Sequence, residues 1–318
     1  MQKPLLLTAL LTVVTITGAR AEPSDPPVTV FASVLPIQTF VERVGGDRVD
    51  ARVMVQPGQS PATYDPTTGQ VAALAKADLY VRIGVPFEDA WMTRIRSAST
   101  DMAILDLRAG LPLREIEAHE HHEGTDDPDG AHDSEHGHDT EPEVQAHSEG
   151  MDPHIWTSPP LVRRMTVAIR DRLSALDPAG AETYAANQAA FDAELAALHT
   201  DLKAILADLE QHRFLVYHPA WGYFADTYGL EQVPIEREGK SPGPRRLDAL
   251  IKQALQSDAR IIFVQPQFDR RAAQQIARAI GGRVETADPL AADYAENLRR
   301  FARLIAAAHS RGHDAVQP

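Results

Sequence analysis

The run of residues 181–209 contains neither Gly nor Pro, and it constrains the fold more than any other stretch of the chain. Its apolar residues recur at steps of three, four or seven, at Tyr184, Phe191, Leu195, Leu198, Leu202, Ile205 and Leu209. This spacing places them on one face of a helix. At about 1.5 Å per residue, the helix would be roughly 40 Å long. We therefore expect one rigid helix that joins the parts of the chain on either side of it.

Short apolar runs alternate with helical patterns on both sides of this run. Strands are expected at 29–34, 50–55, 79–84 and 102–107 before it, and at 214–218, 232–235, 260–265 and 283–287 after it. Helices are expected at 37–45, 68–77, 87–97 and 160–176 before it, and at 247–257, 270–280 and 294–308 after it. Such alternation predicts an α/β protein whose parallel sheets are connected by crossover helices. We expect two lobes joined by the long helix. Ligands of such sheets bind beyond the carboxyl ends of the strands, so a site would lie in the cleft between the lobes.

The first 21 residues have the pattern of a secretory signal peptide. Lys3 supplies a positive charge, residues 5–18 are apolar, and Ala19-Arg20-Ala21 is a typical cleavage site. The absence of cysteine excludes a lipid-anchored cysteine and a disulfide framework. We expect a periplasmic protein with a signal peptide at 1–21, an N-terminal lobe at 22–180, a linking helix at 181–209 and a C-terminal lobe at 210–318.

Residues 119–147 contain seven histidines and ten acidic residues, and no Lys or Arg occurs between Arg114 and Arg163. The net charge of −14 argues against nucleic acid as a partner and is compatible with cations. Because the segment has almost no apolar residues, we expect a disordered loop over 115–150 that collects metal ions, and the alternative is a solvated acidic linker. The accessory metal-binding residues would be His119, His121, His122, His132, His136, His138 and His147.

Three further polar residues stand at predicted strand ends or loop starts. His154 follows Asp152-Pro153, His218 precedes Pro219, and Asp288 precedes Pro289. Two imidazoles and a carboxylate suit zinc, or manganese where oxygen ligands dominate. Each residue alone also has a structural interpretation, because a strand-end histidine can simply be hydrogen-bonded and Asp-Pro often starts a turn. Their spacing does not by itself bring them together.

Several motifs occur in a characteristic order along the chain. They are PGQSPATYDP at 57–66, DPHIW at 152–156, HPAWGYF at 218–224, IFVQPQF at 262–268 and DPL at 288–290. With these motifs the mature chain resembles the zinc/manganese family of periplasmic solute-binding proteins that serve ABC transporters. The resemblance implies a metal between two lobes, with His154, His218 and Asp288 as ligands. It also implies zinc uptake through an inner-membrane permease, without catalysis and by a monomer.

The chain departs from this family at Ala62, where the resemblance implies a first histidine ligand. A methyl group cannot coordinate a metal. The fourth position could be filled by water, by Asp65, Tyr64 or Gln59, or by a histidine of the loop.

Two other functions are weighed against uptake. One is a periplasmic zinc buffer or chaperone, and the other is a zinc-dependent hydrolase with Asp65 or Glu236 as general base. The HDSEH sequence at 132–136 matches a metalloprotease pattern, but it lacks the apolar stripe of a stable helix. We therefore expect a binding protein and not an enzyme.

Overall fold

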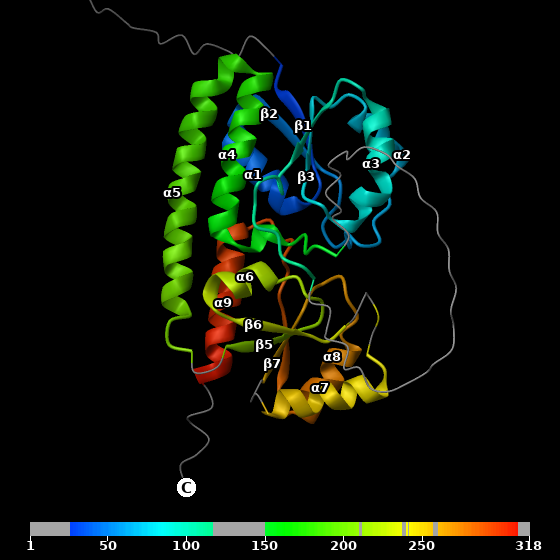
Figure 1. The fold of residues 1–318 in the computed structure, drawn as a ribbon, viewed down its shortest axis with the longest axis vertical. Coiled ribbons are helices and arrows are strands. Elements are labelled where there is room, and N and C mark those ends of the chain that lie inside the picture. Colours follow the sequence, from blue (N-terminus) through cyan, green and yellow to red (C-terminus); the bar gives the residue numbers. More distant parts are fainter. Residues whose placement is uncertain are drawn as a thin grey trace, which may run out of the picture.

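The computed structural model describes residues 26–116, 150–209, 212–236, 240, 242–256 and 260–310, without the side chains of the last two. Two four-stranded parallel sheets form its framework, and helices lie on both sides of each sheet (Figure 1). The predicted α/β class is therefore confirmed. The predicted signal peptide and the histidine-rich segment lie outside the described residues.

The first sheet is built from the residues between Val28 and Asp106. Its strands are β1 (Val28–Ala32), β2 (Val49–Val53), β3 (Leu79–Arg82) and β4 (Ala103–Asp106), in the order β2-β1-β3-β4. In the parallel register, Val28 pairs with Val49 and Leu79 pairs with Ala103. The crossover helices are α1 (Leu35–Gly45), α2 (Thr68–Leu74) and α3 (Pro86–Ala98). Helices α2 and α3 lie on one side of the sheet and α1 lies on the other (Figure 1).

The second sheet repeats the strand order of the first. Its strands are β5 (Arg213–Val216), β6 (Glu231–Pro234), β7 (Ile261–Val264) and β8 (Arg283–Thr286), in the order β6-β5-β7-β8. Its helices are α6 (Gly222–Tyr228), α7 (Pro244–Gln256), α8 (Arg271–Ala279) and α9 (Tyr294–Ser310). In such sheets the carboxyl ends of neighbouring strands on either side of the topological switch form the usual ligand site. Here those strands are β5 and β7.

The predicted long helix is α5 (Ala181–Ile205), which follows α4 (Pro159–Leu176). Its 25 residues end at Ile205, four positions before the predicted end, and the chain turns at 206–208. The helix packs against α1, α4 and α9 and runs beside both sheets (Figure 1).

One hydrophobic cluster is shared by both halves of the chain. It includes Phe40 of α1, Phe191 of α5 and Phe301 of α9. Tyr294, the first residue of α9, packs edge-on against Phe40, with ring centroids 5.0 Å apart. A second cluster lies between the second sheet and helices α7 and α8. The core therefore does not divide at the long helix, and the lobe boundaries at 180 and 210 stay a prediction.

Helix α6 is not predicted by the sequence pattern. With seven residues it is too short to show a helical period. It ends at Tyr228, and the following Gly229, with a φ of 67°, caps the helix in the left-handed conformation that glycine adopts without strain. Among the described residues, no helix combines the length and apolar character needed to cross a membrane.

Candidate metal site

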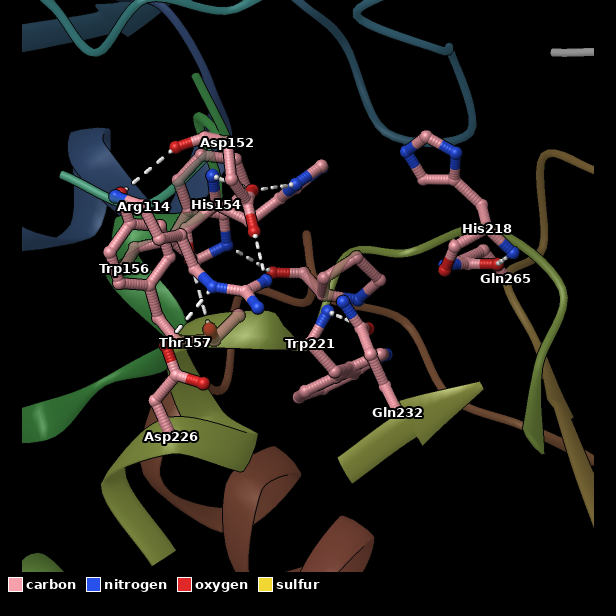
Figure 2. Close-up of polar contacts among 12 residues, drawn as sticks. Arg114, Asp152, His154, Trp156, Thr157, His218, Trp221, Asp226, Gln232 and Gln265 are labelled. Carbon is pink, nitrogen blue, oxygen red and sulfur yellow. Dashed lines mark hydrogen bonds and ion pairs between the residues drawn. The ribbon is translucent and has the colours of Figure 1, made fainter. Parts of the chain in front are cut away.

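Two of the predicted ligands, His154 and His218, lie next to each other between the two sheets, with one ring edge-on to the other. Their ring centroids are 5.3 Å apart and the ring planes are inclined by 75°. His154 immediately precedes the 3-10 helix at Ile155–Thr157, and His218 lies two residues beyond β5. Residues 64 positions apart in the sequence thus meet at one site. Figure 2 shows the polar groups around them.

A buried carboxylate holds the His154 ring. The Nδ1 atom of His154 lies 2.7 Å from Asp152 Oδ1, and the same oxygen accepts the backbone N–H of His154 at 2.9 Å (Figure 2). Arg114 Nη1 donates to the other oxygen of Asp152 at 3.1 Å. Burial acts to raise the pKa of Asp152, but the contacts with His154 and Arg114 outweigh it, and the pKa is lowered. An ionised Asp152 therefore accepts Nδ1–H and leaves Nε2 of His154 as a metal ligand.

His218 is held in the same way by another buried carboxylate. Its Nδ1 lies 2.7 Å from Oε1 of Glu236, two residues beyond β6. The ring stacks on Phe268, with centroids 5.1 Å apart, and Gln265 Nε2 donates to the His218 carbonyl at 2.9 Å. Burial lowers the pKa of His218 below its ordinary value, although Glu236 opposes this shift. The ring is thus kept neutral, which is the form that binds metals.

Asp288, the third predicted ligand, lies two residues beyond β8. Its Oδ1 accepts the backbone N–H of Leu290 at 3.0 Å, and its carbonyl accepts Asn297 Nδ2 at 2.7 Å. No group of three or more His, Cys, Asp or Glu residues is arranged to hold a metal within the described part of the chain. The structure therefore brings two predicted ligands, His154 and His218, close together, and the role of Asp288 stays a prediction.

The two imidazoles open onto a cavity of about 100 Å³ whose walls come from both halves of the chain. Its lining consists of Ser60, Pro61, Ala62, Val85, Pro86, Ile116, Pro153, His154, Trp156, His218, Gln265, Gln267, Phe268, Pro289 and Leu290. Ala62 is thus at the site, and so are the two residues that follow Asp288.

The proposed substitutes for a ligand at Ala62 do not line this cavity. Asp65 and Gln59 are exposed, and the Gln59 Oε1 accepts the backbone N–H of Gln56 at 3.1 Å. Tyr64 is buried, and its ring packs edge-on against Phe87 with centroids 5.0 Å apart. The loop histidines lie outside the described residues. None of these alternatives is tested by the structure.

Sequence reasoning missed the groups that orient the ligands. Asp152 could have been found, because it belongs to the same motif as His154. In the sequence, Glu236 indicates only a candidate general base, and Arg114 is only the last basic residue before the acidic segment. Arg114 also places its Nε 3.0 Å from Asp226 Oδ2 on α6. Its guanidinium lies over Gly222, where an added Cβ would overlap it.

This fold and site define a metal-binding solute-binding protein. Two parallel β-sheets lie beside one long helix, and two imidazoles, each held by a carboxylate, lie between the sheets. The family described as "Zinc-uptake complex component A periplasmic" (ZnuA) matches residues 30–308. The chain belongs to this family. Its members are solute-binding proteins and not enzymes.

Solved structures and curated proteins agree with this assignment. A crystal structure of ZnuA is 37% identical, with a TM-score of 0.77, and the match covers 89% of this chain and 99% of that one. A ZnuA deletion mutant with zinc bound is 36% identical, with a TM-score of 0.76, and the match covers 92% and 100%. The zinc-binding protein AdcA of Streptococcus pyogenes is 27% identical over 298 residues. This match covers 91% of the chain but 56% of AdcA, so the chain spans just over half the length of this curated relative.

Proposed function

We propose that this chain is the periplasmic zinc-binding component of an ABC uptake system, and that it delivers zinc to a permease in the inner membrane. The observation that carries the proposal is the pair of imidazoles 5.3 Å apart, each with Nδ1 engaged by a buried carboxylate. This arrangement leaves both Nε2 atoms for one metal ion. Asp288 is the proposed third ligand. All three proposed ligands belong to one chain, so we propose that the protein acts as a monomer.

The donor set favours zinc over manganese. Imidazole nitrogen suits zinc, whereas manganese prefers carboxylate, carbonyl and water oxygens. The family description names zinc uptake, and a solved relative carries zinc. We propose manganese only as a weaker second cargo. The histidine-rich segment would serve as an accessory metal-collecting loop.

A hydrolase is not supported by the geometry. Glu236 Oε1 is already engaged by His218, and Asp65 is an exposed residue outside the cavity lining. Neither carboxylate is placed to take a proton from a metal-bound water. A zinc buffer would use the same site, and it differs from an uptake component only by having no permease as a partner.

A competition titration with a zinc chelator tests the proposed site. Wild type should bind one zinc tightly, and His218→Ala should abolish this tight one-to-one binding. His199→Ala is the matched control, because His199 lies on α5, contacts Tyr228 and does not line the cavity. Unchanged affinity of His218→Ala would exclude the assignment.

Deleting residues 119–147 separates the loop from the cleft in the same assay. The deletion should lower the number of zinc ions bound but leave the single tight site, because a polar segment contributes little to a core. Loss of the tight site as well would mean that a loop histidine is one of its ligands.

Zinc-limited growth distinguishes uptake from buffering. A strain that lacks this protein should accumulate less zinc than its parent, and wild-type protein with a functional permease should restore accumulation. Restoration without the permease would favour the buffer.

N-terminal sequencing of the periplasmic protein should begin at Glu22 if residues 1–21 are a cleaved signal.

A further inference from the structure

We propose that the zinc between His154 and His218 is completed by a ligand from solution, a small molecule with an imidazole ring such as free histidine. This ligand would occupy the cavity beside Ala62. The inference rests on the proposed function and specifies the form in which zinc is held, as a mixed complex of protein and small chelator.

The described residues supply few metal donors at the cavity. Proteins usually bind zinc with four ligands. Within the described residues, no third His, Cys, Asp or Glu joins His154 and His218 in a group that could hold a metal. Even with Asp288 recruited as a ligand, the described residues leave one position to be filled. Ala62 lines the cavity, and its methyl group has no electron pair to donate to a metal.

The cavity is lined mainly by carbon, from Ala62, Val85 and Pro86 on one side and Phe268 and Leu290 on the other. An ordered water needs two to four polar partners, and these walls offer few of them, whereas they offer extensive contact to a flat apolar ring. A cavity of about 100 Å³ suits a five-membered ring. A planar ring fills this space and can supply nitrogen to the metal.

Gln265 and Gln267 contribute side-chain amides to the lining. Gln265 exchanges both of its amide groups with the His218 backbone, at 2.9 and 3.4 Å. Gln267 Nε2 is buried and has no hydrogen-bond partner among the described residues. A buried donor without an acceptor is costly, and a turn of the Gln267 side chain toward the cavity would let a carboxylate satisfy it. An imidazole that carries a carboxylate, as histidine does, can meet the metal and this amide together.

The experiment is a zinc competition titration of the full chain with and without added imidazole, at fixed free zinc set by a chelator. In wild type, imidazole should raise the apparent zinc affinity, by about tenfold once it is roughly ten times its own dissociation constant. Ala62→His supplies the ring from the chain, so its affinity should be higher at the outset and insensitive to imidazole. Ala62→Leu fills the cavity without a donor and should be insensitive at the wild-type affinity or below.

Two further measurements sharpen the test. In cobalt-loaded wild type, imidazole should change the visible absorption of the metal, and in Ala62→Leu it should not. Free histidine should act at lower concentration than imidazole in wild type, and Gln267→Met should remove that advantage. An equal effect of the two molecules in wild type would overturn the assignment of Gln267.

The outcomes separate this inference from the proposed function. Tight zinc binding that imidazole leaves unchanged overturns the inference alone. The absence of tight zinc binding under both conditions overturns the proposed function. An imidazole effect that emerges only after residues 119–147 are removed shows that the chain supplies its own donor, and this also overturns the inference.

Discussion

The metal site has a half around His154 and a half around His218. In each half a buried carboxylate holds the imidazole, but only the carboxylate of the His154 half has both oxygens engaged. Each imidazole has its Nδ1 2.7 Å from a carboxylate oxygen, and both carboxylate residues are 3% exposed. Asp152 has both oxygens engaged, one by Arg114 and one by His154. Glu236 Oε2 is buried without a partner among the described residues. The His154 half is therefore a saturated network, whereas the His218 half retains an unsatisfied acceptor and is the easier half to rearrange.

The difference follows from how each pair is assembled. Asp152 and His154 are two residues apart, so a local turn sets their contact. Glu236 and His218 are 18 residues apart and are aligned by the parallel pairing of β5 with β6, which continues as Glu236 N–H donating to the Tyr217 carbonyl at 3.0 Å. A local turn fixes the first ligand, and sheet register fixes the second.

The largest effect should come from breaking the saturated half. Asp152→Ala leaves the Arg114 charge without its buried partner, and this should cost about 3–5 kcal/mol of unfolding free energy. Zinc affinity should fall about 10- to 100-fold because the His154 ring loses its orientation. Chemical denaturation and competition titration measure the two effects. Asp226→Ala is the control, since the more exposed partner of the same arginine should contribute at most about 1 kcal/mol. Equal losses in the two variants would contradict the distinction.

A smaller effect should follow from crowding Arg114. In Gly222→Ala the new methyl overlaps the guanidinium, and such overpacking typically costs about 1–3 kcal/mol. Gly69→Ala on α2 is the matched control, because the nearest atom to its added Cβ is 4.0 Å away. Thermal or chemical denaturation of both variants measures the loss of stability. If Gly222→Ala were as stable as the control, Arg114 would not be fixed by its surroundings.

Glu236→Gln tests the unsaturated half with a milder change. The amide keeps an oxygen for His218 Nδ1–H but loses the negative charge that strengthens the metal ligand. We expect zinc affinity to fall about tenfold and unfolding free energy to change by less than about 1 kcal/mol. A stability loss as large as that of Asp152→Ala would show that Glu236 is as firmly built in as Asp152, and the contrast between the halves would fail.

A carboxylate remote from the site provides a reference for acid sensitivity. Arg48 donates two hydrogen bonds to Asp177, at 2.7 and 2.9 Å, and these contacts lower the Asp177 pKa from 3.8 to about 2. A depressed pKa contributes stability that is present above about pH 4 and is lost as the pH falls toward about 2. The stability difference between wild type and Asp177→Asn should therefore be constant at pH 5–7 and shrink below about pH 4. Denaturation curves across this pH range measure the stability difference. A difference that grows on acidification would contradict the lowered pKa of Asp177.

The sequence predicted the elements better than the contacts between them. Helix α5 was predictable because its apolar period runs without Gly or Pro, and the strands were predictable from short apolar runs between helices. Helix α6 was not, because seven residues carry too little periodicity. The approach of His154 to His218 came only from resemblance to a family. The Glu236 contact depends on the register of β5 and β6, which no local pattern encodes.

The packing of α9 against α5 and Phe40 bears on when the protein can finish folding. Helices α1, α5 and α9 all contribute to a single apolar cluster. A nascent chain that stops before Tyr294 must leave Phe40 and Phe191 in contact with water, however well the first sheet has formed. Synthesis must therefore be almost complete before the core closes, and products truncated before α9 should be degraded rather than survive as a folded half.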